Sequence, residues 1–148
     1  MKYEPTLEGF QEFITATMRI PSSALPSDSP VITYVYEAAV AIVLKYLKRV
    51  STGLYTFAVY NLAASFLIQF AQDQPGSTFF ADYRKAHNIG VFNPGIISSS
   101  SDSTTSQSWL ASDWMKNLSL SDLQRLKDPY GLAYLQIAQS WGAIWGLT

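Results

Sequence analysis

The sequence at residues 30–72, PVITYVYEAAVAIVLKYLKRVSTGLYTFAVYNLAASFLIQFAQ, decides the fold of this 148-residue chain. A helix is predicted over residues 30–50, because Ser29 followed by a proline is a typical helix start and no breaker follows. A short turn at residues 51–53 leads into a second predicted helix at residues 54–72. Two long helices joined by so short a turn are expected to form an antiparallel hairpin.

Shorter helices are expected on both sides of this central hairpin. Thr6 is the predicted N-cap of a helix at residues 7–19, and three prolines within residues 21–30 predict an extended strap after it. A further helix is expected at residues 79–88, and the Asp-Pro pair at residues 128–129 predicts the start of a last helix. No convincing alternating pattern predicts a strand. The predicted fold class is therefore mainly α, a helical bundle around the central antiparallel hairpin.

A long polar loop or arm is predicted at residues 93–108. From Ser98 to Ser108 the chain is almost entirely serine, threonine and other polar residues, which have little to bury and compete for backbone hydrogen bonds. We expect a flexible Ser/Thr-rich arm that orders on contact with a partner. Ser98 and Ser108, at its two ends, are therefore candidate interface residues.

Residues 109–148 are predicted to hold the C-terminal helices and a docking tail of the single domain 1–148. A capping box at residues 119–122 predicts a brief helix before the last one. Trp141 and Trp145 gather near the C-terminus, where they belong either to the core or to a tail that inserts into a neighbouring subunit. Both interpretations stay open at this stage.

Charged residues are scarce in this chain. They make up 14% of the sequence, where about 25% is usual, while 48% is hydrophobic and 14% aromatic. Ten Lys and Arg against eleven Asp and Glu give a formal net charge of −1, which excludes a strongly basic nucleic-acid arm. The absence of cysteine excludes disulfides, thiolate metal sites and cysteine nucleophiles. The N-terminal residues do not form an apolar signal segment, so synthesis in the cytoplasm is expected.

Residues 50–72 contain no charged side chain and are long enough to cross a bilayer as a helix. However, Asn61, Ser65, Gln69 and Gln72 lie within a narrow stripe on one face of that helix. A helix surrounded by lipid would leave these polar groups without partners. Interfaces between subunits are depleted in charge and rich in aromatic residues, as this chain is. We therefore expect Asn61, Ser65 and Gln69 to contact another subunit.

No motif in the sequence predicts an enzyme. His87 is the only histidine, so a two-histidine metal site is excluded, and the sequence has neither a G-x-S-x-G motif nor a phosphate-binding loop. No cofactor and no metal are expected. Lys45, Lys48 and Arg49 lie near the end of the predicted helix at residues 30–50, where positive charge complements the helix dipole. A contact between these side chains and DNA is the alternative.

Several phrases of the sequence resemble a known group of proteins. They are YEPTLEGF at residues 3–10, LSLSDLQRLKDPYG at residues 118–131, AYLQIAQ at residues 133–139 and WGL at residues 145–147. Together with the strap and the Ser/Thr-rich arm, these phrases look like the small virion proteins of contractile-tailed bacteriophages that act in the neck or in head completion.

This resemblance implies a structural virion protein that forms a ring in the head-to-tail connector, as an adaptor or a collar. The homo-oligomeric ring is expected to hold about twelve copies, or alternatively about six. It would join the portal protein to other neck or tail proteins, and DNA would pass through it without specific binding. The resemblance implies a place in the virion neck, with no membrane and no catalytic turnover.

Two other functions are open from the sequence. The first is a small membrane-active phage protein that uses the hairpin as a membrane span. The second is a DNA-binding accessory protein that works through Lys45, Lys48 and Arg49, for which salt-dependent binding to DNA would be the signature.

Overall fold

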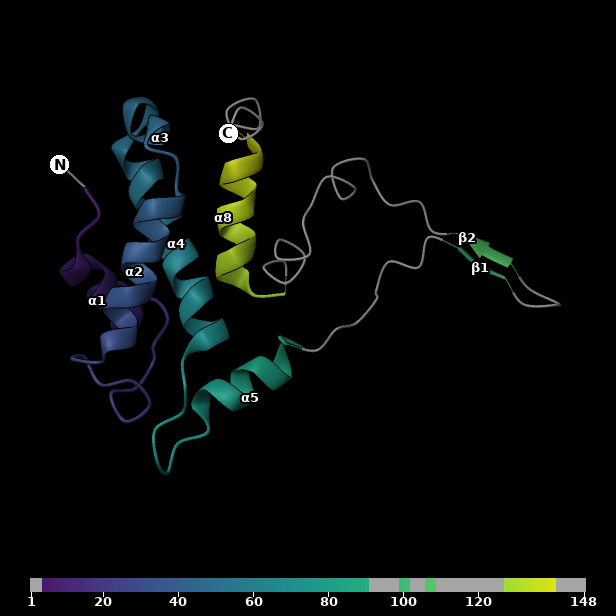
Figure 1. Ribbon diagram of the computed structural model, residues 1–148, viewed down its shortest axis with the longest axis horizontal. Helices are drawn as coiled ribbons and strands as arrows, with labels where there is room; N and C mark the ends of the chain where they lie inside the picture. Colours follow the sequence, from purple (N-terminus) through teal and green to yellow (C-terminus); the bar gives the residue numbers. More distant parts are fainter. Residues whose placement is uncertain (1–3, 91–98, 102–105, 109–126, 141–148) are drawn as a thin grey trace.

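The structure, a computed structural model, describes residues 4–90, 99–101, 106–108 and 127–140. Over these residues the chain is mainly α-helical and its helices pack as a bundle, which confirms the predicted fold class (Figure 1). The helices are α1 (Leu7–Ala16), α2 (Pro30–Ile42), α3 (Tyr46–Val50), α4 (Thr52–Phe70), α5 (Phe79–Ala86) and α8 (Pro129–Ser140), and the strands are β1 (Ser99–Ser101) and β2 (Ser106–Ser108).

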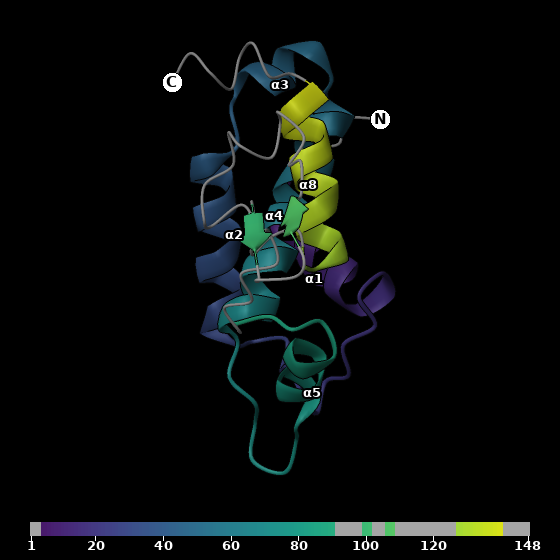
Figure 2. The same ribbon diagram turned by 90° about the vertical axis from the view of Figure 1, so that its right-hand side faces the viewer.

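Helix α4 is the centre of the bundle. Eleven of its nineteen residues are buried, and α1, α2, α3, α5 and α8 all contact it. Both α2 and α8 run in the opposite direction to α4 and flank it in two perpendicular views (Figures 1 and 2). The fully buried Ala58, Ala63 and Ala64 let these neighbours approach closely, because the distance between helix axes depends on the side chains at the contact. The predicted antiparallel hairpin is therefore confirmed.

The first helix of the hairpin is shorter than predicted. It ends at Ile42, and Val43 has extended backbone angles (φ −65°, ψ 128°) before α3 begins at Tyr46. The prediction of one unbroken helix at residues 30–50 is therefore wrong. Two adjacent β-branched residues, Ile42 and Val43, are weak helix formers, and the break turns the chain so that α3 packs on α4. Val43 and Leu47 both stay in the core, at 2% and 5% exposure.

The cap residues fix the starts of three helices. Thr6 accepts a hydrogen bond from the backbone nitrogen of Gly9 (3.0 Å) at the start of α1, as predicted. Pro30 is the first residue of α2, also as predicted. Helix α4 begins at Thr52, two residues before its predicted start, because the Ser51 hydroxyl accepts from the backbone nitrogen of Leu54 (3.3 Å). The turn between α3 and α4 is thereby reduced to Ser51 alone.

The strap after α1 closes one side of the bundle. Helix α1 ends at Ala16 rather than near residue 19, and Arg19 has a left-handed backbone conformation (φ 54°). The strap itself forms turns and no helix, as its prolines predict. Its Ala24 and Leu25 are buried at 0% and 5% exposure, so the strap contributes to the hydrophobic core.

Helix α5 is fastened to the end of α4 by two charged side chains. The Asp73 carboxylate accepts from the backbone nitrogens of Phe80 (2.8 Å) and Ala81 (3.0 Å) in the first turn of α5. One Arg84 guanidinium nitrogen donates to the carbonyls of Ile68 (3.0 Å) and Ala71 (2.8 Å). These carbonyls belong to the C-terminal end of α4, which has no later turn to satisfy them.

Within the segment predicted as an arm, the structure describes a two-stranded antiparallel pairing. Ser99 pairs with Ser108 and Ser101 with Ser106. No strand was predicted there, because an antiparallel ladder is made by backbone groups and forms without the alternating apolar pattern by which strands are recognised. The rest of the predicted arm and the predicted capping box at residues 119–122 lie outside the described residues.

Candidate functional site

A buried polar cluster joins α4 to the start of α8. Asp128, which is 1% exposed, precedes the first residue of α8, and its Oδ1 accepts from the backbone nitrogen of Gly131 (2.7 Å). Its Oδ2 accepts from the hydroxyl of Ser65 on α4 (2.9 Å). The Gln69 amide donates in turn to Ser65 Oγ (3.3 Å), one helical turn further along α4. The carboxylate thus caps α8 and ties that cap to the middle of the bundle.

This cluster corrects the prediction that Asn61 and Ser65 contact another subunit. Their side chains are 3% and 0% exposed within a single chain, and Asn61 Nδ2 donates to the carbonyl of Phe57 (2.8 Å). Gln69 is partly buried. The uncharged polar stripe has hydrogen-bond partners in protein, as expected. For Ser65 and Gln69, however, these partners belong to the same chain and lie around Asp128.

Burial has the largest effect on the pKa values of the acidic and phenolic groups near this cluster. It raises the pKa of Asp128, although the hydrogen bonds from Gly131, Ser65, Tyr130 and Gln69 act in the opposite direction. Burial also raises the pKa of Tyr83 to about 12, with smaller contributions from Tyr130 and Asp128. A carboxylate held this way serves as an internal cap, since its oxygens are directed at groups of its own chain.

The only histidine is not directed at this serine and carboxylate. His87 Nδ1 lies 3.0 Å from the carbonyl of Tyr83, and the two rings stack with centroids 4.2 Å apart. Ser65 donates directly to Asp128 instead. Among the described residues, serine, histidine and aspartate are therefore all present, but they are not assembled in the order that a hydrolytic triad needs.

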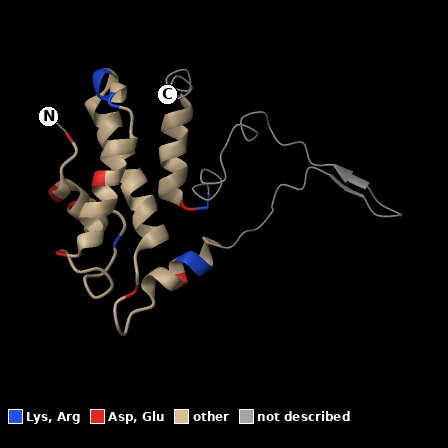
Figure 3. Ribbon diagram, viewed as in Figure 1, with Lys and Arg blue, Asp and Glu red and all other residues tan. Residues whose placement is uncertain are grey.

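The basic residues considered for DNA contact lie at one end of the molecule. Lys48 and Arg49 belong to the last turn of α3, and Lys45 precedes that helix (Figure 3). Lys48 Nζ forms an ion pair with a carboxylate oxygen of Glu4 (2.8 Å), and both side chains remain exposed to solvent. This hydrogen bond, together with the Coulomb attraction of Glu4, raises the pKa of Lys48.

A shallow apolar groove lies between α2 and α4, and we treat it as the candidate functional site. Its volume is about 290 Å³. Tyr34 and Phe70 on its surface are 69% and 62% exposed, although large apolar side chains usually avoid water. The groove contains no charged side chain; its lining residues are Val31, Tyr34, Val35, Ala38, Phe66 and Phe70.

Further exposed apolar side chains occur on the same helices and on α3. Tyr46 and Phe57 are each 48% exposed, and α4 carries no charged residue from Thr52 to Phe70. In Figure 3 the helices α4 and α8 carry no charged residue, and the charged residues lie on α1, α2, α3 and α5 and in the loops. Contiguous exposed apolar surface marks sites where proteins interact. The residues that line the groove form such a surface. The other exposed large apolar side chains on these helices are Ile42, Val50 and Leu54.

Sequence reasoning missed this groove. Within α2, Ile32, Val35 and Ala39 are buried, whereas Tyr34 and Ala38 are exposed. The sequence did contain a signal for an exposed apolar face, because apolar residues surround almost the whole circumference of α2. A helix with that pattern has to be covered on more than one face.

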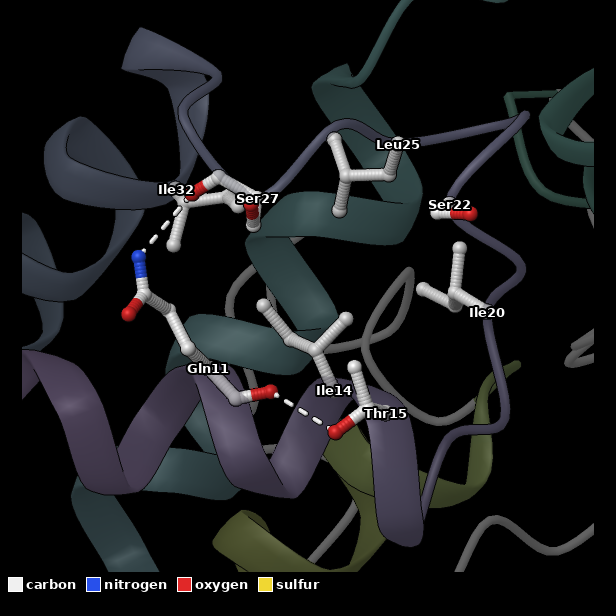
Figure 4. Close-up of a pocket in the computed structure, with 8 residues that line it drawn as sticks. All are labelled: Gln11, Ile14, Thr15, Ile20, Ser22, Leu25, Ser27 and Ile32. Atoms are coloured by element: carbon white, nitrogen blue, oxygen red, sulfur yellow. Dashed lines mark hydrogen bonds between the residues drawn. The ribbon is translucent and has the colours of Figure 1, made fainter.

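A second, smaller pocket lies between α1, the strap and the start of α2 (Figure 4). Its volume of about 70 Å³ has room for a few water molecules, far less than an organic ligand needs. The Gln11 amide crosses its mouth and donates to the carbonyl of Ser27 (2.9 Å), while the Thr15 hydroxyl donates to the Gln11 carbonyl (3.3 Å). The bond from Gln11 to Ser27 holds the strap to α1, so the pocket is a feature of packing.

Helix α4 is long and apolar enough to cross a membrane by length and composition. However, 61% of its most apolar window is buried inside the protein, as in the core helix of a bundle. Among the described residues, no group of three His, Cys, Asp or Glu side chains is placed to hold a metal ion.

Three of the predicted site residues, Ser98, Trp141 and Trp145, lie outside the described residues. Ser108 is the last residue of β2, where its backbone pairs with Ser99. The predictions for these four residues stay predictions.

Comparison with known proteins adds no relative. No protein-family model matches the chain, and neither a curated protein nor a solved structure matches it. The likeness to phage neck proteins therefore depends on the sequence phrases alone.

Proposed function

We propose that this protein is a structural subunit that assembles with copies of itself and forms a ring in the head-to-tail connector of a contractile-tailed phage. The observation that carries the proposal is the exposed apolar groove between α2 and α4, with Tyr34 and Phe70 at its surface. A subunit of a closed ring has to cover such a surface with a neighbour.

The energetic argument concerns the large aromatic side chains. Moving a side chain such as Phe or Tyr from water to a buried position stabilises the assembled state by about 1.5–3 kcal/mol. Tyr34 and Phe70 are 69% and 62% exposed in the single chain. Association that buries both of them gains enough to offset part of the entropy lost on assembly.

The charge distribution also supports a connector ring. Neither α4 nor α8 carries a charged residue, and the formal net charge of the chain is −1. A channel that DNA passes through works best without clusters of Lys and Arg, because such contacts release counterions and retain DNA. The expected partners are the portal protein and other neck or tail proteins, the location is the virion neck, and no cofactor is involved.

Sedimentation velocity and native mass spectrometry of the purified full chain test this proposal. We expect a closed oligomer of about twelve copies, or alternatively about six, that appears as a ring in negative-stain micrographs. A chain that stays monomeric at every concentration, in the presence and absence of a purified portal ring, contradicts the proposal.

A membrane-active protein is the second candidate, because α4 has the length and hydropathy of a span. Fractionation of cells that express the chain separates the two functions. Recovery in the membrane fraction, with release only by detergent, would favour the span and overturn the ring. Recovery as soluble assemblies would favour the ring.

A further inference from the structure

We propose that the apolar groove of one copy receives the C-terminal segment, residues 141–148, of a neighbouring copy. This inference rests on the proposed function, because it names the contact by which neighbouring subunits would be joined. Two observations support it. The groove and the segment are both apolar and uncharged, and α8 ends far from the groove of its own chain.

The groove selects for an apolar occupant. All six side chains that line it are apolar or aromatic, with Tyr34 and Phe70 as its exposed members. An occupant with charged side chains would have to lose their hydration there without gaining a partner. A short segment with large apolar side chains matches the groove, as amphipathic helices do in hydrophobic grooves.

The segment at residues 141–148, WGAIWGLT, has this composition. It contains no charged side chain, and its apolar residues Trp141, Ile144 and Trp145 follow the i, i+3, i+4 spacing of one helix face, with Leu147 on the flank of that face. Tryptophan is also the side chain that most often carries binding energy in protein interfaces. The chain therefore contains an apolar segment of the kind that the groove selects.

The position of α8 favours a neighbouring copy over the same chain. Asp128 lies beside Ser65, so α8 begins close to the α4 end that forms the groove, and it runs back towards α3 (Figures 1 and 2). Its 12 residues therefore carry the chain about 18 Å away from the level of the groove. Residues 141–148 span about 12 Å as a helix. Docked as a helix, these residues therefore do not reach the groove of their own chain.

Docking of a tail into the groove of a neighbour determines the symmetry of the assembly. The tail and the groove are different surfaces, so each copy gives one contact and receives another, which makes a heterologous interface. Interfaces of this type close into rings when the rotation between neighbours permits it. A pairing of two identical grooves would instead stop at a dimer.

Direct binding tests the contact without depending on ring formation. The chain truncated after Ser140 is titrated against a dye-labelled peptide of residues 141–148, and fluorescence anisotropy is measured. We expect saturable binding that is at least tenfold weaker for the truncated chain with Phe70→Lys. The matched control is Phe57→Lys, which changes another exposed phenylalanine of α4 outside the groove and should leave binding unchanged.

Three results would overturn the proposal: no binding, equal loss in both variants, or binding that Phe70→Lys leaves unchanged. Circular dichroism of each variant excludes unfolding as the cause of a loss. If residues 109–126 of the same chain occupy the groove, the peptide will not bind the truncated chain either, and the proposal fails.

Mixing two defective variants of the protein distinguishes this contact from the ring itself. Phe70→Lys keeps its tail and loses its groove, whereas the chain truncated after Ser140 keeps its groove and loses its tail. Each alone should sediment as a monomer, and an equimolar mixture should form a dimer through the one intact pair. If the truncated chain still forms the wild-type oligomer, the tail contact is refuted while the structural-subunit proposal stands. If the wild-type chain is monomeric with or without the portal ring, the proposed function fails even where the peptide binds.

Discussion

Replacing Asp128 by alanine is expected to destabilise the junction between α4 and α8. The carboxylate is almost completely buried and accepts hydrogen bonds from Gly131 N (2.7 Å) and Ser65 Oγ (2.9 Å). Loss of an N-cap acceptor costs about 0.5–2 kcal/mol, and a buried hydroxyl left without its acceptor costs about 1–3 kcal/mol more. Removing the buried charge offsets part of this, so we expect a net loss of about 2–4 kcal/mol in the free energy of unfolding.

Urea and thermal unfolding of the full chain, followed by far-ultraviolet circular dichroism, measure this loss. For a chain of this length, 1 kcal/mol corresponds to about 2–4 °C in Tm, so a decrease of about 4–15 °C is expected. Asp28→Ala, at an exposed position of the strap, is the matched control and should stay within about 0.5 kcal/mol of the wild type.

A third variant tests whether Ser65 and Asp128 act together. Ser65→Ala removes the donor of the 2.9 Å bond, and the double variant Ser65→Ala/Asp128→Ala should lose less stability than the sum of the two single variants. If Asp128→Ala unfolds like Asp28→Ala, the buried cluster does not hold α8 and the reasoning is refuted.

Three further predictions concern the pKa of Asp128, the hydrogen bonds of Arg84 and the binding of DNA. Burial raises the pKa of Asp128 above its unfolded value, so the folded chain binds a proton first as pH falls, and this group's contribution to stability grows until the unfolded pKa is reached. Asp128→Asn should lack this part of the pH dependence in urea unfolding between pH 7 and about pH 4. Arg84→Ala should free the carbonyls at the end of α4, lower stability by about 1–3 kcal/mol and speed hydrogen exchange in α5, whereas Lys85→Ala should change little. Binding to DNA should be weak, and neutralising the basic residues of α3 should leave its salt dependence unchanged, whereas a steep slope that is lost on neutralisation would support the DNA-binding alternative.

Helix starts were predictable from the sequence because their signals are local. Thr6 caps α1, Pro30 opens α2, and Asp128 with Pro129 opens α8, each through contacts within a few residues. The break at Val43 was not predictable in this way. No proline or glycine marks it, and the turn is stabilised by the packing of α3 on α4, which only the folded chain shows.

The candidate site was predictable only in part. The stripe of Asn61, Ser65 and Gln69 indicated that this face of α4 needs polar partners, which is correct for the folded chain. The acceptor for Ser65 is Asp128, 63 residues further along the chain, and no local pattern connects the two. With that face satisfied within the chain, the described residues leave the apolar groove exposed, and this groove is formed by two helices together.

The buried cluster also bears on the choice between a membrane span and a soluble subunit. If α4 crossed a bilayer, it would have to leave α8, which would break the bond between Ser65 and Asp128. Ser65 would then face lipid without its acceptor, and an unsatisfied polar group there costs several kcal/mol. The buried alanines would also lose their close contacts with the neighbouring helices. The hydropathy of α4 is thus accounted for by its place at the centre of the bundle, and the groove beside it is an apolar surface that the described residues leave exposed.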